Sequence, residues 1–317
     1  MECRPLGKSG LQVSLLAFGG VELGLPYGIG VNSRADMLSD DQAVELLQAA
    51  LARGVTLFDT APSYGNSEAL LGRAFASCRS RVVLCTKCPG LADDQGRVLR
   101  KRAMRDRVLA SLDGSLQALR TDAVDVLMLH RVDAAVIAND EAAELFEDLK
   151  SQRLIRAVGA STYPGGITGQ VIESGRWDVI QLAFNLIDQR ETAFLGAAET
   201  AGIGVMVRSV LFKGILTERG RDLHPELRHI QDHRARCAAA VPPGMTLAEY
   251  ATRYAMSQRG VHAVLVGIDR SAYLDEALAM AAAGPLTPGQ LAEATALAFP
   301  DPELIDLPGW HAKGWLT

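Results

Sequence analysis

The stretch VTLFDTAPSYGNSEALLGRAF, residues 55–75, shows in one unit the pattern that recurs along the chain. It opens with a short apolar run typical of a β-strand, and this run ends on an acid, Asp59. A Pro-Ser-Tyr-Gly turn follows and carries Tyr64, and a helix is expected to begin near Ser67. An acid and a phenol that directly follow a strand are fixed by rigid backbone and exposed by a loop. We therefore expect Asp59 and Tyr64 to take part in chemistry.

The same alternation of apolar run and helical segment extends over most of the chain. Most of the runs are nearly continuous in Val, Ile and Leu, which is typical of parallel strands buried on both faces. The helical segment Asp41 to Arg53 has Ser39 or Asp40 to cap its start and Gly54 to end it. Eight strands, each followed by a helix, favour an α/β fold of the (β/α)8 TIM barrel type over a doubly wound sheet. The expected strands are 13–18, 55–60, 81–87, 124–130, 155–161, 178–184, 204–209 and 261–267.

Composition agrees with a single soluble domain that spans residues 1–317. The chain is 48% hydrophobic and 22% charged, and its net charge of −5 offers no basic field for nucleic acid or an anionic membrane. No apolar run approaches the length of a membrane span, and the amino terminus lacks the apolar centre of a signal peptide. Five cysteines, an odd number at irregular spacing, do not form a disulfide framework. We therefore expect a reduced, cytoplasmic protein.

Two more ionisable residues stand where later apolar runs end, Lys87 after VVLCT and His130 after VDVLML. Three of the four residues have an ordinary explanation when taken alone, because an Asp can cap a turn and a Tyr or a His can pack in a core, whereas a Lys at the end of a buried strand is unusual. In a barrel, however, all four strand ends meet on one face. Because a buried ammonium needs a partner, we expect Lys87 to pair with Asp59 and His130 to face Tyr64. The group is expected to transfer protons.

The words FDTAPSYG, TK and LMLH around these four residues resemble the motifs of the aldo-keto reductase superfamily. The resemblance runs from about Leu6 to about Glu276 and so covers most of the chain. It implies a (β/α)8 barrel that binds a nicotinamide cofactor and reduces carbonyls. It also implies a short amino-terminal hairpin that closes the bottom of the barrel, and the Pro-rich carboxyl-terminal tail is expected to be irregular. Some sequence segments are also similar to those of the family's aldose dehydrogenase-type members.

The resemblance implies a role for each of the four residues. Tyr64 is the general acid, His130 orients the carbonyl by a hydrogen bond, and Lys87 with Asp59 tunes Tyr64. A free phenol has a pKa near 10 and is a slow acid–base group at neutral pH. A neighbouring Lys87 cation is expected to lower the pKa of Tyr64.

No GxGxxG motif follows a strand, so a Rossmann half is not indicated. The resemblance implies instead that the dinucleotide binds on the barrel loops. Thr162 stands where the family has Asn, and Arg208 stands where an aromatic ring often stacks on nicotinamide. A guanidinium can also stack on a ring, and its charge is expected to shift the affinity for oxidised cofactor without abolishing binding. The residues that the resemblance assigns to this part of the cofactor are Gly20, Asp59, Ser161, Thr162, Gln181, Arg208, Ser209, Leu211, Lys213 and Gly214.

The adenine end of the cofactor is expected at VGIDRSAYLDEA. Its assigned residues are Gly267, Arg270, Tyr273 and Glu276. The fork of Arg270 matches the oxygens of a 2′-phosphate, whereas Asp269 could accept a hydrogen bond from the free 2′-hydroxyl of NAD. NADP(H) is favoured, and NAD(H) stays open.

Two sequence patterns resemble metal-binding or redox motifs but are not expected to form such sites. Cys85 and Cys88 form a C-x-x-C inside a strand, where alternation points Cys85 to the same side as Lys87 and Cys88 elsewhere. His229 and His233 are spaced i,i+4 but lack accompanying ligands, so a solvated polar helix is expected there. We expect no metal.

These observations predict an NAD(P)(H)-dependent oxidoreductase that interconverts aldehydes or ketones with alcohols, with Tyr64 as general acid. An aldose 1-dehydrogenase and a cofactor-sensing regulatory protein with little turnover are the alternatives. The partner is a small carbonyl or sugar, without nucleic acid or membrane. Trp310 and Trp315 in the tail could wall the pocket, stack on a sugar or pack on the barrel, and packing is favoured. The sequence leaves open the physiological substrate, the reaction direction and the oligomeric state.

Overall fold

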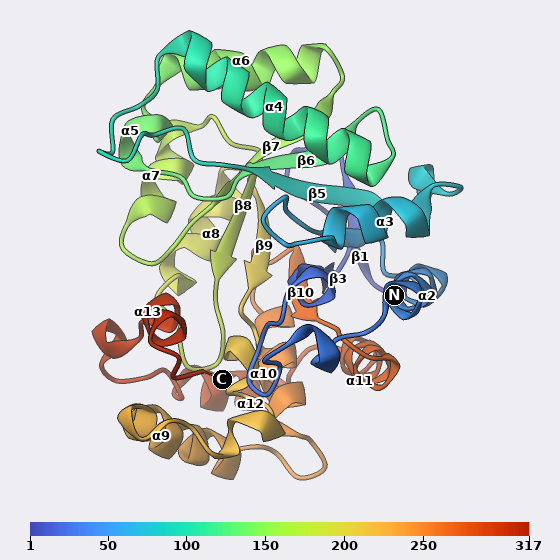
Figure 1. Ribbon diagram of the computed structural model, residues 1–317. Helices are drawn as coiled ribbons and strands as arrows, with labels where there is room; N and C mark the ends of the chain where they lie inside the picture. Colours follow the sequence, from blue (N-terminus) through green and yellow to red (C-terminus); the bar gives the residue numbers. More distant parts are fainter. Residues whose placement is uncertain (317) are drawn as a thin grey trace.

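Eight parallel strands close into a barrel in this computed structural model, which describes residues 1–316 (Figure 1). The barrel closes because β10 pairs with both β9 and β3. This ring of strands confirms the (β/α)8 fold expected from the sequence. The barrel strands are β3 (Leu16–Gly19), β4 (Leu57–Asp59), β5 (Val83–Cys88), β6 (Val124–Leu129), β7 (Ile155–Ser161), β8 (Val179–Ala183), β9 (Gly204–Arg208) and β10 (Ala263–Gly267).

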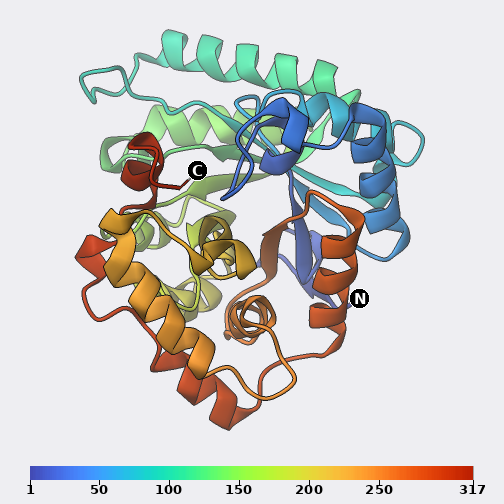
Figure 2. The ribbon, with the colours of Figure 1, turned by 60° about the horizontal axis from the view of Figure 1, so that its bottom comes forward.

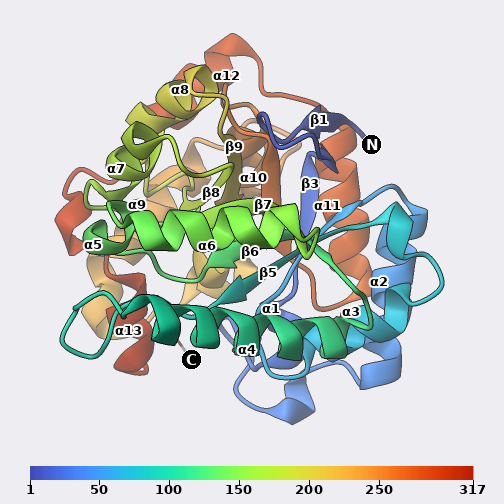
Figure 3. The same cartoon turned by 90° about the horizontal axis from the view of Figure 1, so that it is seen from above.

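Helices surround the barrel and bury the outer faces of its strands. Helices α4 and α6 lie side by side over β5, β6 and β7, as Figures 1 and 3 show from two directions. The helices are α1 (Val21–Gly24), α2 (Asp40–Ala52), α3 (Ser67–Phe75), α4 (Lys101–Leu119), α5 (Ala134–Ile137), α6 (Asp140–Ser151), α7 (Ile167–Ser174), α8 (Thr192–Thr200), α9 (Arg228–Ala239), α10 (Leu247–Met256), α11 (Ser271–Ala282), α12 (Pro288–Thr295) and α13 (Leu307–Ala312).

Helix α2 begins and ends as its sequence predicts. The Ser39 hydroxyl accepts a hydrogen bond from the backbone N–H of Gln42, and the Gln42 side chain accepts one from the backbone N–H of Ser39. This capping box satisfies two N–H groups that the first turn of a helix leaves free. Gly54, just after the helix, has a φ of +93°. Glycine adopts that conformation without steric cost, so the chain can leave α2 and enter β4.

The expected first strand, 13–18, is in fact two strands. β2 (Gln12–Ser14) pairs antiparallel with β1 (Cys3–Pro5), and β3 begins only at Leu16. The leucines of this hairpin, Leu6 and Leu11, are buried in one cluster with residues that line the inside of the barrel. The hairpin therefore closes the amino-terminal end of the barrel, as the resemblance implied.

Side chains alternate between the inside and the outside of the barrel along each strand. Cys85 belongs to the inner apolar cluster, whereas Cys88 belongs to the outer core beneath the helices. This confirms the orientation predicted from alternation in β5. Both thiols are buried and free, so they do not form a redox pair in this structure.

The carboxyl-terminal tail is less irregular than expected. It contains a short 3-10 turn, Pro302–Leu304, and α13, which lies beside the end of the chain in Figure 2. Trp310 on α13 is buried and packs edge-on against Phe212, with ring centroids 6.0 Å apart. Trp315 stacks on His224 with centroids 5.5 Å apart. Both tryptophans thus pack, and in doing so they hold the tail against the loops after β9.

Helix α9 is not the solvated polar helix that its sequence predicted. His233 is buried, its Nε2 lies 2.8 Å from the Leu297 carbonyl oxygen, and its ring contacts Phe299. His233 therefore attaches α9 to the segment after α12. Among residues 1–316, no group of His, Cys, Asp or Glu side chains is arranged to hold a metal. The same residues contain no helix long and apolar enough to cross a membrane.

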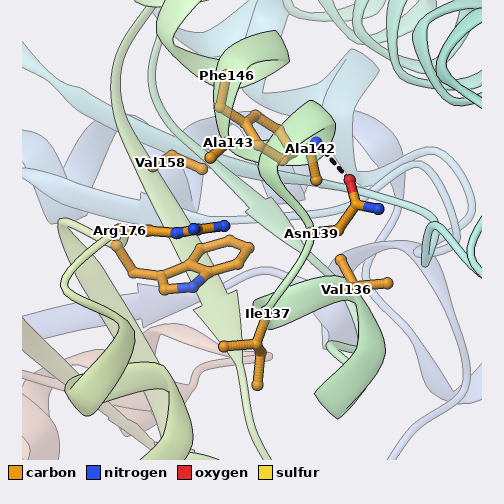
Figure 4. Close-up of a pocket in the computed structure, with 9 residues that line it drawn as sticks. Val136, Ile137, Asn139, Ala142, Ala143, Phe146, Val158 and Arg176 are labelled. Carbon is orange, nitrogen blue, oxygen red and sulfur yellow. Dashed lines mark hydrogen bonds between the residues drawn. The ribbon is translucent and has the colours of Figure 1, made fainter.

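A small cavity lies between α5, α6 and β7 (Figure 4). Its volume is about 10 Å³, which fits about one water molecule. Two of its lining residues have polar atoms, Trp177 Nε1 and Arg176 Nη1, that are buried without a hydrogen-bond partner in the described part of the chain. None of its lining residues belongs to the Asp59, Tyr64, Lys87 and His130 group, so it is not the substrate site.

Candidate active site

Lys87 and Asp59 form a buried ion pair at the carboxyl-terminal ends of β5 and β4. Lys87 Nζ lies 2.8 and 2.7 Å from the two Asp59 carboxylate oxygens and 2.9 Å from the Thr60 carbonyl oxygen. Burial alone would lower the pKa of Lys87, but the charge and hydrogen bond of Asp59, together with Tyr64 and Cys85, outweigh burial and raise that pKa above its ordinary value. Lys87 is therefore a fully buried cation, and the pairing expected from the sequence is present.

Tyr64 stands beside this pair because the turn after β4 is tightly constrained. A Cβ on Gly65, which has a φ of +56°, would lie 2.2 Å from the Gly24 carbonyl oxygen, so only glycine fits. The turn places Lys87 Nζ 4.9 Å from the centre of the Tyr64 ring. The His130 ring meets the Tyr64 ring edge-on, with centroids 5.6 Å apart. The four predicted residues are thus brought together.

The pKa of Tyr64 is raised and not lowered, contrary to the sequence-based expectation. Burial raises this pKa, and the positive charges of Lys87 and Arg208 counter the effect of burial only in part. The desolvation cost of a phenolate in this site exceeds the gain from its cationic neighbours. Tyr64 therefore keeps its proton at neutral pH, which suits a proton donor.

His130 directly follows β6 and is neutral at neutral pH. Burial, and after it the charge of Lys87, lowers the pKa of His130 to about 4. Its Nδ1 lies 3.4 Å from the Ser63 hydroxyl. A neutral imidazole still has one N–H, so His130 can donate a hydrogen bond to a substrate oxygen without carrying charge.

The expected cofactor residues on β3, β7 and β8 lie next to the tetrad formed by Asp59, Tyr64, Lys87 and His130. Gln181 donates a hydrogen bond from Nε2 to Asp59 Oδ1 at 2.8 Å. Gly20 donates from its backbone N–H to the Asp59 carbonyl oxygen at 2.9 Å, and a Cβ there would lie 2.6 Å from that oxygen.

Ser161 ends β7, Thr162 directly follows it, and both are buried. The Thr162 hydroxyl accepts a hydrogen bond from Thr168 at 2.8 Å. Thr162 therefore uses its hydroxyl inside the protein, which is a further difference from the amide that the family has at this position.

The loop after β9 holds an unusual backbone conformation. Ser209, Phe212 and Lys213 have φ values of +60°, +51° and +58°, and Gly214 follows at +100°. Left-handed conformations cost free energy at non-glycine residues and cluster at functional sites. Leu211 packs partly buried against the core and, with Phe212, anchors the loop.

Lys213 projects from this loop toward the tail. Its Nζ lies 4.9 Å from the centre of the Tyr27 ring and contacts His311 Nδ1. Burial lowers the pKa of Lys213 to about 8. The loop between β3 and α2, the loop after β9 and the tail thus meet at one side chain.

The two residues expected to compete over the cofactor 2′-position are paired with each other. Arg270 Nε lies 3.1 Å from Asp269 Oδ1, and the guanidinium lies 4.9 Å from the Tyr273 ring centre. Arg219 approaches the same carboxylate at 3.5 Å. Gly267 ends β10 close by, and Glu276 is exposed on α11.

Three side chains near these residues were not predicted from the sequence as part of the site: Glu22, Tyr27 and Arg219. Glu22 Oε2 is buried without a partner within residues 1–316, and a Cβ on Gly267 would lie 2.0 Å from Glu22 Oε1. Burial raises the pKa of Glu22 to about 8. Nothing in the spacing around Glu22 marks it as buried, and Arg219 lies in a charged segment indistinguishable from an ordinary solvated loop.

The residues present fit a long anionic ligand such as a dinucleotide. Lys213, Arg219 and Arg270 bring three cations to the loops after β9 and β10. The glycines at the ends of the neighbouring strands let a ligand approach the backbone closely. Guanidinium and ammonium groups are suited to phosphate oxygens.

Comparison with known proteins identifies the family. The model of the aldo/keto reductase family matches residues 16–298. The chain belongs to the aldo/keto reductase family. This aldo/keto reductase is 29% identical over 293 residues to L-galactose dehydrogenase of Arabidopsis thaliana, with 88% of each chain covered. It is 29% identical over 228 residues to the NADH-specific methylglyoxal reductase of Escherichia coli K12, covering 67% of this chain and 68% of that protein.

A solved structure shows the same fold. An aldo-keto reductase from Bacillus halodurans in its holo form matches this aldo/keto reductase with a TM-score of 0.79. The match covers 94% of this chain and 96% of that one at 24% identity. The family match and the named oxidoreductases among its relatives identify the protein as an NAD(P)-dependent enzyme of the family.

Proposed function

We propose that this enzyme interconverts aldehydes or ketones with alcohols and that Tyr64 is its general acid. The observation that carries the proposal is the position of the protonated Tyr64 phenol between the Lys87–Asp59 pair and the neutral His130 ring. Carbonyl reduction needs a proton donor, a hydrogen-bond donor to the carbonyl oxygen and a nearby positive charge. The Tyr64 phenol, the His130 N–H and the Lys87 cation provide these three groups close together.

The residues of the chain divide the work of the reaction. The cofactor, when bound, supplies a hydride to the carbonyl carbon. His130 donates a hydrogen bond to the carbonyl oxygen and orients it. As the carbonyl π electrons move onto that oxygen, Tyr64 gives it the phenolic proton. Lys87, held by Asp59, stabilises the negative charge that then remains on the Tyr64 oxygen. In the oxidation direction the same groups act in reverse.

The cofactor residues are assigned by the same proposal. Gln181 and Ser161 would bind the carboxamide end near the tetrad, while Lys213, Arg219 and Arg270 would meet the phosphates. We favour NADP(H), because Arg270 and Arg219 together outweigh the single negative charge of Asp269. NAD(H) remains the alternative cofactor, because one relative is named as specific for NADH.

Oxidation of an aldose at its hemiacetal carbon is the second candidate. The similarity to a protein named L-galactose dehydrogenase favours it. A cofactor-sensing role with little turnover is disfavoured, because the four residues needed for proton transfer are all present and in contact.

A substrate panel tests the proposal. Purified enzyme is assayed with aldehydes and ketones in the reducing direction and with alcohols and free sugars in the oxidising direction, each with NADP(H) and NAD(H). Turnover of carbonyls supports the first candidate, and turnover restricted to free sugars supports the second. Tight cofactor binding without turnover of any of these compounds would overturn both.

A further inference from the structure

Arg208 is a fixed cation beside the tetrad. It is the last residue of β9, and its Nη2 donates a hydrogen bond to the Thr162 carbonyl oxygen at 2.9 Å. Its Nη1 lies 3.4 Å from the Ser209 hydroxyl. The guanidinium carbon lies 4.4 Å from the centre of the Tyr163 ring. A contact on one face and hydrogen bonds at the edge hold the guanidinium in place.

The charge of Arg208 is not neutralised by an ion pair. No carboxylate within residues 1–316 lies within ion-pairing distance of it, whereas the other cation of the site, Lys87, is paired with Asp59. The acid that senses its charge is Glu191, whose own pKa burial raises. Lys87 and Asp59 offset each other, so Arg208 is a cation of the site that has no ion-pairing carboxylate in the described part of the chain.

This charge reaches the groups that carry out the chemistry. Burial raises the pKa of Tyr64 and lowers that of His130, and Arg208 acts on both as a nearby positive charge that lowers the pKa. In the proposed reaction the hydride donor must stand within reach of the carbonyl that Tyr64 protonates. A cation close enough to act electrostatically on Tyr64 and His130 is therefore also close enough to act on a bound nicotinamide ring.

The nicotinamide ring is neutral when reduced and positively charged when oxidised. We propose that Arg208 weakens the binding of the oxidised cofactor relative to the reduced one and so favours alcohol or hemiacetal oxidation on the enzyme. In that direction the substrate carbon gives a hydride to the ring, which loses its positive charge, and the substrate hydroxyl gives its proton to Tyr64 in its deprotonated, phenolate form. Electrostatic repulsion between Arg208 and the ring is relieved as the reaction proceeds. This inference rests on the proposed function.

A different use of Arg208 would be to bind a carboxylate or phosphate of the substrate. The geometry disfavours it, because such binding needs the N–H edge of the guanidinium. Two of its five N–H groups already face Thr162 and Ser209, which leaves only the remaining three for an anion. The face opposite Tyr163 is the part left to meet a planar ring.

Cofactor affinities test the inference without turnover. Dissociation constants of NADP+, NADPH, NAD+ and NADH are measured by calorimetry for the wild type, Arg208→Gln and Arg208→Lys. The matched control is Arg156→Gln, which removes a partly exposed arginine paired with Asp125 at the opposite end of the barrel. For each cofactor, the quantity compared is the dissociation constant of the oxidised cofactor divided by the dissociation constant of the reduced cofactor.

Arg208→Gln should lower this ratio by about tenfold, mainly by tighter binding of the oxidised form, as expected for loss of a unit charge several ångströms away. Arg208→Lys keeps the charge and should keep the ratio within about threefold, and Arg156→Gln should leave it unchanged. The ratio of oxidation to reduction rates should fall in Arg208→Gln.

Three results would overturn the inference. Equal changes in all four affinities would mean that Arg208 only supports the fold of the loop. An unchanged ratio with a raised KM for anionic substrates alone would assign Arg208 to the substrate. If the wild type binds none of the four nucleotides, the proposed function fails, and the inference fails with it.

Discussion

Lys87 Nζ contacts both carboxylate oxygens of Asp59, at 2.7 and 2.8 Å, and the Lys87 side chain has no exposed surface. Two opposite charges removed from water in this way depend on each other. Removing one leaves the other buried without a counter-charge, which is more costly than removing both. The pair thus links the stability of the barrel to its chemistry.

Replacing Lys87 by Met should therefore lower the free energy of unfolding by about 3–5 kcal/mol and depress turnover strongly. The double variant Lys87→Met/Asp59→Asn should regain a large part of that stability but none of the turnover. Urea unfolding of the two single variants and the double variant measures this coupling. Additive losses in the double variant would show that the two side chains do not depend on each other.

Glu22 should make the stability depend on pH. Its pKa is about 8 in the folded protein and is taken as 4.5 when unfolded. Between these values the unfolded chain has lost a proton that the folded protein keeps, so stability falls as pH rises through this window. Glu22→Gln should remove this loss and be more stable than the wild type by up to about 5 kcal/mol well above pH 8, but not below pH 4.5. The measurement is thermal unfolding of the wild type and of Glu22→Gln across the pH range. Unfolding temperatures that change with pH by the same amount in both proteins would contradict this prediction.

His130 should not titrate in the working pH range. With its pKa lowered to about 4 by burial, the ring stays neutral from mildly acidic pH upward. The pH profile of kcat/KM for carbonyl reduction should lack an inflection near 6.5, the ordinary value for histidine. An acid limb near that value that disappears in His130→Gln would show that His130 works as a charged group.

Arg270 should discriminate between the two cofactors. If its guanidinium binds the 2′-phosphate, Arg270→Ala should weaken NADPH binding by roughly 1.5–3 kcal/mol and leave NADH binding nearly unchanged. Because Arg270 is paired with Asp269, Asp269→Ala serves as the matched variant and should strengthen NADPH binding. Equal loss of both cofactors in Arg270→Ala would assign this side chain to the fold or to the adenine ring.

The barrel and the tetrad could be predicted because each depends on local sequence. Runs of Val, Ile and Leu mark buried parallel strands, and an ionisable residue at the end of such a run has few structural reasons to be there. Lys87 is the clearest case, since a lysine at the end of a buried strand needs a partner in space. The placement of all residues in one domain stays a prediction.

Features set by tertiary burial were not predictable. The strand boundary at Leu15 appears only because the hairpin folds back under the barrel. His233 and Glu22 carry no local sign that distant segments cover them. The pKa of Tyr64 depends on a balance between desolvation and the charges of Lys87 and Arg208, and spacing alone reveals only the charges.

Proton donation by Tyr64 is most directly tested by Tyr64→Phe, which removes the hydroxyl and keeps the ring. Cofactor affinity and unfolding temperature should stay close to those of the wild type, because no described hydrogen bond of the fold depends on the Tyr64 hydroxyl as donor. The rate of a single turnover with bound NADPH should fall by roughly 10²–10⁴-fold. A variant that folds, binds cofactor and reduces carbonyls at a near-normal rate would contradict the assignment of Tyr64 as the general acid.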